Sequence, residues 1–488
     1  MIRFFKVFEM FIQKLEFFID PVKLFGFLDQ GKRKDKLSFL HDPTVVTAGE
    51  VEKKFSIIVC GSKVLTDKIE NPNTENLREV FEALEAELDG RKKVLENYLE
   101  NFVLKDEVKN LPFLSGLVGF FSYDLGLGFE NIGSSCADDR GYPSYYFTVS
   151  EEVLLVDHVK KEMWVVLPDE SDLEFFESLK HVNFKEPIII TEEDEGGVNS
   201  NLTEEQYCEK IRCVKEYLRK GETYQVNFSQ RFNFQSLKSP WEVYKKVSNI
   251  NPSRHQVFLP GKYSNEINAE NFWIVSNSPE RLFKIGVGDD GRRVIETRPI
   301  KGTIGVKGYE SEDELKVLGQ ELKDSEKDKA ELEMIVDMSR NDLGRICEFG
   351  TVEVVEHRAL EKYSHLLHTA STVQGVLRDG PDLYDIFRAL FPGASITGCP
   401  KKRTMEIIDR LEEYSRGVYC GSMGYLDCRG GADFNIMIRT LFAKENRRAG
   451  FGYVMHSGGG IVYDSTPELE FKETFDKVNA FLHAIKEY

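Results

Sequence analysis

The stretch Glu296-Thr-Arg-Pro-Ile-Lys-Gly-Thr303 is a strand-like run that ends in a single lysine followed at once by glycine. Most lysines in such a setting are surface side chains beside a turn. If Lys301 is instead a nucleophile, the chain must also supply an acid, a binding site for an anion and a metal site. Those features are what the flanking sequence has to provide.

The length and charge of the chain limit what it can bind. Its 488 residues are enough for two fused modules or one large two-layer domain, and 41% hydrophobic residues can fill a large interior. The formal net charge of -18 at pH 7 argues against binding to nucleic acid or to an anionic membrane surface. An anionic small molecule can bind only where local cations and backbone N–H groups outweigh the negative potential that this net charge produces.

The cysteines and the first residues favour a cytoplasmic protein. The eight cysteines form no Cys-x-x-Cys pair and no tight Cys/His spacing, so we expect reduced thiols and no zinc site. Arg3, Lys6, Glu9 and Lys14 interrupt the apolar residues at the start, which argues against a signal peptide. No run of about 18 apolar residues is present that could span a membrane.

The chain is expected to consist of two regions joined by a linker. Residues 1–195 have a mixed α/β pattern, with a buried strand predicted at 56–60 and a charged helix at 74–101. Residues 191–200 are acidic, contain glycine and lack apolar periodicity, which favours a linker. The second region covers 203–488.

The second region opens with a helix that has clear ends. Thr203 and Gln206 form a capping box, the helix is expected to reach about Arg219, and Gly221 stops it. The elements expected after it are strands at 224–232 and 272–276, a helix near 241–249, and one or two charged helices within 310–345.

One segment matches a nucleotide-binding string without the structure that such a site needs. Gly286-Val-Gly-Asp-Asp-Gly291 fits the pattern Gly-x-Gly-x-x-Gly. The residues that follow have a strand pattern, so no helix N-terminus is expected there to bind a pyrophosphate, and Asp289 and Asp290 would repel it. We therefore predict a hairpin loop.

A carboxylate within a helical apolar stripe is a candidate metal ligand. Glu331 precedes Ile335 and Met338 by four and seven residues, so it shares a helix face with apolar side chains and needs a partner. That partner is either a cationic side chain or a metal. Glu331 and Glu473 both offer the hard oxygen ligands that suit magnesium.

The last helix carries further charged candidates. Thr466 is expected to cap this helix. Glu470, Glu473 and Lys477 are three and four residues apart and share one face, as ordinary surface charges also do. The glycines within 457–460, just before the helix, present bare backbone amides that suit an anion.

Several of these stretches occur together in the order found in one enzyme family. They are Ser278-Pro-Glu-Arg281, Arg298-Pro-Ile-Lys-Gly-Thr303, Glu331 with Arg340-Asn-Asp-Leu-Gly344, His365-Leu-Leu-His368, 391–401, Ile438-Arg439 and 458–465. The chain resembles the chorismate-utilising enzymes over about 203–482, and more weakly around 113–130.

The resemblance implies both a fold and a substrate. The implied fold is α+β, with α/β/β/α layers made of two packed, mainly antiparallel sheets and outer helices. Residues 1–195 would form a region like the amino-terminal part of anthranilate synthase component I, and both regions would pack into one two-sheet unit. Chorismate is the implied substrate and magnesium the implied cofactor.

Two positions distinguish the reactions within the family. Isochorismate and salicylate synthases resemble one another in having a water-activating lysine where this chain has Gln225, and glutamine cannot act as a general base. Anthranilate synthases share the glutamine but typically have alanine in place of Lys301. The lysine version resembles the aminodeoxychorismate synthases, component I, and the anthranilate synthases remain the alternative.

The resemblance also implies a role for each candidate residue. Lys301 would attack C2 of chorismate while Glu280 protonates the departing C4 hydroxyl, and ammonia would then expel the lysine. Glu331 and Glu473 would hold magnesium, with Glu470 as an outer or second ligand. The residues implied to bind substrate are Gln225, His368, Ser395, Arg439, Gly459, Gly460 and Lys477. A histidine such as His368, in an apolar run, is also typical of a packed core.

At two places the sequence departs from the family pattern, and both bear on assigning the family's residue roles to this chain. Residues 286–292 lengthen the hairpin between Glu280 and Lys301, so the convergence of these two side chains requires the insertion to loop outward. Leu332 and Glu333 occupy positions where relatives often carry other residue types.

The chain has no Gly-x-Cys-x-Gly loop of a glutaminase. The resemblance therefore implies that ammonia comes from a separate glutamine amidotransferase subunit, in a heterodimer with this chain. Any regulatory tryptophan pocket is expected in the amino-terminal half, although its usual signature is not visible near Leu15. A subunit that only binds a glutaminase, without catalysis, is the alternative from another class.

Overall fold

The computed structural model describes residues 10–29, 37–41, 55–101, 106–182, 198–264, 269–288, 290–306, 311–362, 366–446 and 450–486. The start of the chain, most of the predicted linker at 191–200, Asp289 and His365 lie outside these residues. Among the helices that the structure describes, none is long and apolar enough to cross a membrane.

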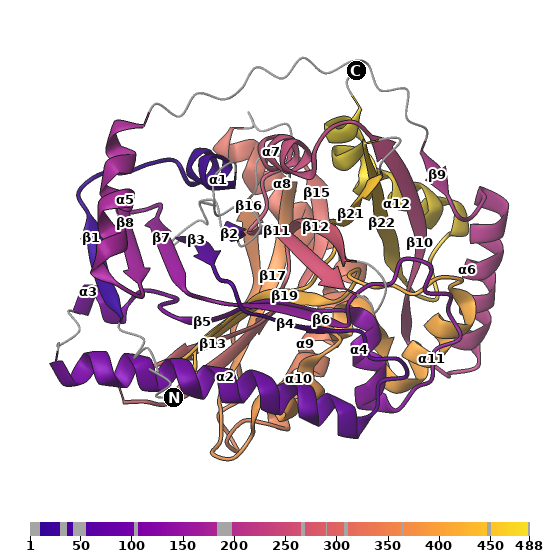
Figure 1. Ribbon diagram of the computed structural model, residues 1–488. Helices are drawn as coiled ribbons and strands as arrows, with labels where there is room; N and C mark the ends of the chain where they lie inside the picture. The colour runs from indigo at the N-terminus through magenta and orange to yellow at the C-terminus, as the bar shows by residue number, and fades with distance from the viewer. Residues whose placement is uncertain are drawn as a thin grey trace.

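Two large antiparallel sheets dominate the described part of the chain (Figure 1). The first is 12-stranded, in the order β1 (Phe11–Leu15), β8 (Glu162–Leu167), β7 (Glu152–Asp157), β3 (Phe55–Cys60), β2 (Leu37–His41), β11 (His255–Ser264), β12 (Ala269–Ser278), β21 (Thr440–Asn446), β22 (Gly450–Ile461), β10 (Gln225–Ser236) and β18 (Gly398–Cys399), with β9 (Asn199–Ser200) beside β10.

The second sheet is 10-stranded and includes the stretch that contains Lys301. Its order is β15 (Ile300–Gly305), β17 (Leu366–Val376), β14 (Arg293–Arg298), β13 (Arg281–Val287), β20 (Ala432–Asn435), β19 (Ser422–Asp427), β5 (Gly116–Phe121), β6 (Tyr145–Val149) and β4 (Val64–Asp67), with β16 (Glu353–Lys362) beside β17.

Helices cover the outer faces of both sheets. They are α1 (Pro21–Asp29), α2 (Thr74–Asn101), α3 (Asp106–Lys109), α4 (Tyr123–Leu127), α5 (Leu173–Ser178), α6 (Glu204–Arg219), α7 (Pro240–Ile250), α8 (Glu312–Asp324), α9 (Glu326–Gly344), α10 (Leu383–Leu390), α11 (Lys401–Leu411) and α12 (Pro467–Ile485). In Figure 1, α2 runs along the lower edge of the molecule, whereas α7 and α12 lie at the top.

The hydrophobic core is divided among the layers. One cluster joins the second sheet to α2, α9 and α10, and another joins the first sheet to α1, α7 and α12. Between the sheets, Phe272 of the first sheet packs edge-on against Phe120 and Tyr146 of the second, with ring centroids 6.3 and 5.2 Å apart. This arrangement confirms the predicted α+β fold with α/β/β/α layers.

Strands from the two predicted regions share both sheets. In the first sheet β2 pairs with β11, so Phe39 lies opposite Phe258. In the second sheet β5 pairs with β19, where Gly119 lies opposite Gly424. Neither region therefore completes a sheet without strands of the other, while the predicted boundary at 195 lies outside the described residues and stays a prediction.

Most of the local elements follow the sequence pattern. The helix predicted at 74–101 is α2, and the charged segment within 310–345 forms the two helices α8 and α9. The capping box is present, because the Gln206 amide donates to Thr203 Oγ1 at 3.3 Å and the Thr203 amide donates to Gln206 Oε1 at 2.9 Å. The Gly-x-Gly-x-x-Gly string lies in the hairpin between β13 and β14, as predicted.

The expected side-chain cap of the last helix is not formed, and this prediction was wrong. Thr466 occupies the cap position of α12, but its side chain makes no capping hydrogen bond. Its ψ angle is 118°, whereas the capping residues Thr203, Ser239 and Ser311 have ψ angles of 164°, 153° and 160°. The helix begins instead with Pro467, whose missing N–H leaves one donor fewer to satisfy.

Candidate active site

A cavity of about 720 Å³ brings together most of the predicted site residues. Its walls come from β15 and α9 on one side, and from β22 and α12 on the other. The predicted residues that line it are Glu280, Lys301, Glu331, Ser395, Arg439, Gly459, Gly460, Glu470, Glu473 and Lys477. A volume of this size suits a small organic substrate.

Lys301 projects from β15 and is held by an ion pair. Its Nζ lies 2.9 Å from Oε2 of Glu331, and both side chains are mostly buried, with 21% and 15% exposed. Gly302 follows with a φ of +77°, which glycine adopts without strain. A Cβ there would also lie 3.1 Å from Cβ of Asp328 on α9. The Lys-Gly pair therefore fits a close contact between strand and helix.

Glu280 lies between β12 and β13 and is 7% exposed. Burial raises the pKa of its carboxyl to about 7, although a hydrogen bond with Ser395 and the charge of Lys301 both lower it. A carboxyl with this pKa is partly protonated near neutral pH and can donate a proton. Lys301 and Glu280 line the same cavity despite the longer hairpin, because that hairpin extends from the far ends of β13 and β14.

The glycines at the end of β22 lie against the charged face of α12. A Cβ on Gly459 would be 2.9 Å from Oε2 of Glu470, 3.8 Å from Nζ of Lys477 and 3.9 Å from Oε1 of Glu473. Lys477 donates to the Gly458 carbonyl at 2.8 Å and lies 2.7 Å from Glu473. The glycines that precede this helix in the sequence thus also lie against its charged face in the structure.

The two carboxyls of this helix face have opposite pKa shifts. For Glu473, burial raises the pKa, but the charge and hydrogen bond of Lys477 more than offset it, so the pKa lies below its ordinary value. For Glu470, burial and the charge of Glu473 outweigh the opposing effects of Ser465 and Lys477, so the pKa is raised. The positive charge of Lys477 therefore offsets the effect of burial at Glu473 but not at Glu470.

The three predicted magnesium ligands all line this cavity. Glu331, Glu470 and Glu473 present carboxylate oxygens on two facing walls. Within the described residues, however, no three His, Cys, Asp or Glu side chains are close enough together to hold a metal as they stand. Glu331 is paired with Lys301, and Glu473 with Lys477.

Gln225 lies behind the cavity wall. It is 1% exposed, and a Cβ added to Gly460 would come within 2.9 Å of its side-chain Cδ. Its Nε2 lies 3.5 Å from the Ser395 carbonyl. The side chain therefore packs beneath Gly460 rather than lining the cavity.

His368 lies beside the main cavity. It borders a small hollow of about 50 Å³ that also contains Arg439 and Thr303, both of which line the main cavity. Its Nε2 lies 3.0 Å from Oε2 of Glu361. The other carboxylate oxygen of Glu361 accepts hydrogen bonds from Arg254 at 3.2 Å and Arg298 at 2.6 Å. His368 is thus both buried and oriented by a charged network.

Several residues of the cavity were missed from the sequence. They are Asn227, Lys327, Asp328, Tyr419, His456 and Asp476, and Glu361 is missed in the network behind His368. Lys327 and Asp328 had a usable signal, because they precede Glu331 by about one helical turn. Tyr419 lies in the turn between α11 and β19 and carries no sequence pattern that marks it.

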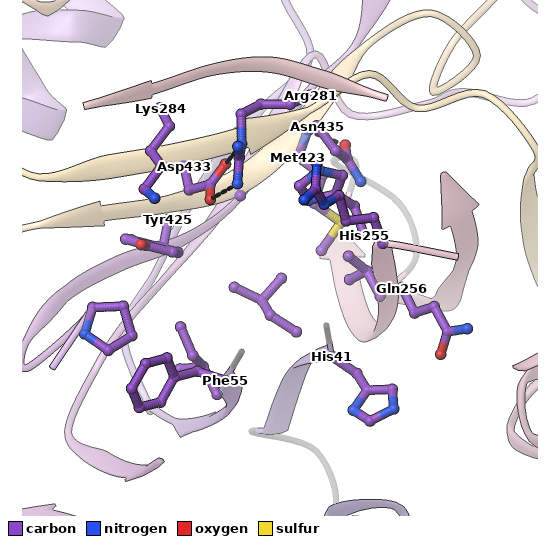
Figure 2. A pocket seen from close by; sticks show the side chains of 16 residues that line it. His41, Phe55, His255, Gln256, Arg281, Lys284, Met423, Tyr425, Asp433 and Asn435 are labelled. Atoms are coloured by element: carbon purple, nitrogen blue, oxygen red, sulfur yellow. Dashed lines mark hydrogen bonds and ion pairs between the residues drawn. The ribbon is translucent and has the colours of Figure 1, made fainter. Parts of the chain in front are cut away.

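A smaller cavity of about 110 Å³ lies between the sheets (Figure 2). Residues of both predicted regions line it, including Leu40 and Phe55 from the first and Tyr425 from the second. Arg281 and Asp433 form a two-contact ion pair on its wall, at 2.9 and 3.0 Å. Within the described residues, no side chain that lines this cavity also lines the candidate active site, although Arg281 on its wall directly follows Glu280.

The site therefore combines a buried lysine, a carboxyl able to donate a proton, and a carboxylate-rich wall with cations and bare amides. Such a set suits an acidic small molecule that undergoes nucleophilic substitution.

Comparisons with known proteins agree with this chemistry. The family model described as chorismate binding enzyme matches residues 54–483. Aminodeoxychorismate synthase component 1 of Bacillus subtilis is 37% identical over 385 residues, 77% of each chain. Anthranilate synthase component 1 of Acetivibrio thermocellus is 35% identical over 401 residues, 78% of this chain and 76% of that protein.

A solved structure shows the same fold. The crystal structure of anthranilate synthase component I from Streptococcus pneumoniae has a TM-score of 0.69 and 26% sequence identity, covering 89% of this chain and 94% of that one. The chain belongs to the chorismate-binding enzyme family and is an enzyme that acts on chorismate.

Proposed function

We propose that the chain is component I of an aminodeoxychorismate synthase, which converts chorismate and ammonia into 4-amino-4-deoxychorismate for p-aminobenzoate and folate synthesis. The observation that carries the proposal is Lys301, whose amine enters the same cavity as the protonatable Glu280. Relatives of similar identity include both aminodeoxychorismate and anthranilate synthases, so the choice between them rests on this residue.

In the first proposed step, the neutral amine of Lys301 attacks C2 of the chorismate ring. A C2–N bond forms, the ring double bonds shift, and the C4–O bond breaks. Glu280 donates its proton to the departing hydroxyl, which leaves as water. The raised pKa of Glu280 suits this role, because a carboxyl with an ordinary pKa would be ionised at neutral pH.

In the second step ammonia attacks C4, and the C2–N bond to Lys301 breaks as the double bonds return. The amine of Lys301 leaves with the electron pair of that bond, and one proton of the added ammonium passes to Glu280. Both side chains regain their starting protonation states. The enolpyruvyl group is retained, which distinguishes this product from anthranilate.

The ion pair of Lys301 with Glu331 has to open before the first step. The amine of Lys301 donates to this carboxylate at 2.9 Å, and it must leave that contact before its lone pair can be directed at C2. Magnesium would be held by Glu331 and Glu473, with Glu470 as a further ligand, and would neutralise a substrate carboxylate. Arg439, Lys477 and the amides around Gly459 and Gly460 would receive carboxylate oxygens.

Ammonia is proposed to come from a separate glutamine amidotransferase subunit that forms a heterodimer with this chain. This part of the proposal rests on the resemblance and on the lack of a glutaminase nucleophile loop in the sequence.

The proposal is tested by incubating the purified protein with chorismate, magnesium and ammonium, and by identifying the product by mass. Aminodeoxychorismate retains the pyruvate group, whereas anthranilate has lost it. Anthranilate as the main product would replace the proposal with the anthranilate synthase alternative. A folded protein without any turnover under these conditions would favour a subunit that only binds a glutaminase.

A further inference from the structure

A second cavity shares one wall with the candidate active site. It has a volume of about 280 Å³ and is lined by 410–414, at the end of α11 and just after it, by Ser229 and Arg231 of β10, and by Asn201, Leu202 and Lys210. Among the residues that the structure describes, His456 of β22 alone lines both this cavity and the active-site cavity.

The two cavities follow one another along the same face of neighbouring strands. In the pairing of β10 with β22, Arg231 lies opposite His456 and Asn227 lies opposite Gly460. Arg231, Ser229 and Asn227 are two residues apart, so their side chains point to the same face of the sheet. Arg231 and Ser229 line the second cavity, whereas Asn227 lines the active site. The inward face of β10 therefore runs from one cavity toward the other. The buried ion pair of Arg416 with Glu412 lies along this face, where Glu412 accepts a hydrogen bond from Ser229.

The imidazole of His456 lies where the two cavities adjoin. The ring of His456 stacks on that of Tyr419, with centroids 5.5 Å apart and an interplanar angle of 15°. The histidine is 5% exposed, and its Nε2 is buried with no hydrogen-bond partner among the residues that the structure describes. Buried polar atoms are nearly always paired, so this nitrogen is suited to a small solute that can form a hydrogen bond.

The surroundings of His456 disfavour a positive charge. Burial lowers the pKa of its imidazole well below the ordinary value, and the charges of Arg231 and Arg416 lower it further. Both arginines are fixed, since Arg231 lies 2.7 Å from Asp139 and Arg416 lies 2.7 Å from Glu412. A neutral solute would pass the imidazole more readily than a cation of the same size.

We propose that the second cavity is the inlet through which ammonia reaches the active site, with His456 as the gate between the two. Ammonia fits because it is small, uncharged, and able both to donate and to accept a hydrogen bond. The inlet lies on the side of Asn227 and Tyr419, because Asn227 shares a face of β10 with the second cavity and Tyr419 stacks on His456. The inference rests on the proposed function, because the inlet has a purpose only in an amination.

The inlet is tested by narrowing it with Arg410→Trp, because Arg410 is exposed on α11 and lines the second cavity. Lys402→Trp is the matched control, since Lys402 is exposed on the same helix and does not line either cavity. With free ammonium as the nitrogen source, we expect Arg410→Trp to raise the KM for ammonia at least about fivefold, with the KM for chorismate unchanged. Lys402→Trp should leave both constants at the wild-type values.

A second variant acts on the gate. His456→Ala removes the ring that both cavities share and should lower the KM for ammonia. Chorismate affinity is measured in parallel, since His456 also lines the active site. An unchanged KM for ammonia in both Arg410→Trp and His456→Ala would overturn the inlet while leaving the proposed function intact. A wild-type protein that binds chorismate but does not aminate it would overturn the proposed function itself.

Discussion

Nζ of Lys301 donates a 2.9 Å hydrogen bond to Oε2 of Glu331, so the candidate nucleophile and a candidate magnesium ligand are ion-pair partners. The partner of Glu331 was predicted to be either a cationic side chain or a metal, and whichever of these it binds decides whether Lys301 remains in its ion pair. A site that binds magnesium through Glu331 would also free the amine of Lys301. Cofactor binding and nucleophile activation would then be one event.

Replacing the lysine tests its covalent role. We expect Lys301→Ala to abolish any covalent adduct with chorismate detected by intact mass, and to lower kcat by at least about 100-fold. Lys327→Ala is the control, because Lys327 lines the same cavity and lies 3.9 Å from the same carboxylate, yet its side chain is 63% exposed. Normal product formation by Lys301→Ala without an adduct would show that ammonia adds directly.

The raised pKa of Glu280 predicts a pH dependence of stability. The carboxyl titrates at about 7 in the folded protein and near 4.5 when unfolded, so folding favours its protonated form. The stabilisation is full below pH 4.5, decreases as the pH rises, and is lost above about pH 7. A difference of this size corresponds to about 3 kcal/mol.

Glu280→Gln replaces the titrating carboxyl with an amide that stays neutral at every pH. The variant should be more stable than the wild type in denaturant at pH 8 and no more stable at pH 4, while kcat falls about 100-fold or more through loss of the proton donor. Equal stability of the two proteins at pH 8 would show that Glu280 is ionised at no cost, and would remove the argument for its role as an acid.

Glu361 is predicted to be essential to the orientation of His368. Its carboxylate contacts His368, Arg254 and Arg298, and it is 1% exposed. Glu361→Gln would leave two mostly buried guanidinium groups without their counter-charge, so we expect the free energy of unfolding to fall by about 3–5 kcal/mol.

The matched control for this network is Glu356→Gln. Glu356 also pairs with Arg298, but its side chain is 49% exposed, so its replacement should cost less than about 1 kcal/mol. Urea unfolding of both variants measures the difference. An equal decrease in the free energy of unfolding of both variants would mean that the buried carboxylate of Glu361 stabilises the protein no more than the exposed one of Glu356.

The sequence predicted those parts of the site whose signals are local. Lys301 is marked by the glycine after it, and Glu470, Glu473 and Lys477 by their spacing on one helix. The layers were predictable as well, through the family resemblance. Glu361 could not be found in this way, because its partner Arg254 is 107 residues away and is brought to it by the folding of the sheets.

The pairing of Lys301 with Glu331 illustrates the same limit. Each residue was identified, but they are 30 positions apart, and their contact depends on how α9 packs against β15. The prediction that Thr466 caps α12 was wrong for a different reason. Thr466 is at the expected position, but the backbone angle that directs its hydroxyl is set by the chain on either side.

The glycines of β22 allow a test of the substrate wall by single methyl groups. A Cβ on Gly459 would lie 2.9 Å from Oε2 of Glu470, so Gly459→Ala forces that carboxylate to shift. Gly452 lies on the same strand, and a Cβ there meets nothing within 4 Å. Gly459→Ala and Gly452→Ala therefore make the same chemical change, but only the methyl group at 459 contacts Glu470.

We expect Gly459→Ala to raise the KM for chorismate about tenfold or more, because the displaced carboxylate and the new methyl group both intrude on the bare amides proposed to receive the substrate. Gly452→Ala should bind chorismate as the wild type does, with thermal unfolding showing that both variants fold. Magnesium titration, followed by intrinsic fluorescence, separates a shift of Glu470 from steric exclusion of substrate, since only the shift would weaken metal binding in the absence of chorismate. A Gly459→Ala protein with wild-type affinity for both chorismate and magnesium would show that neither is bound against this end of β22.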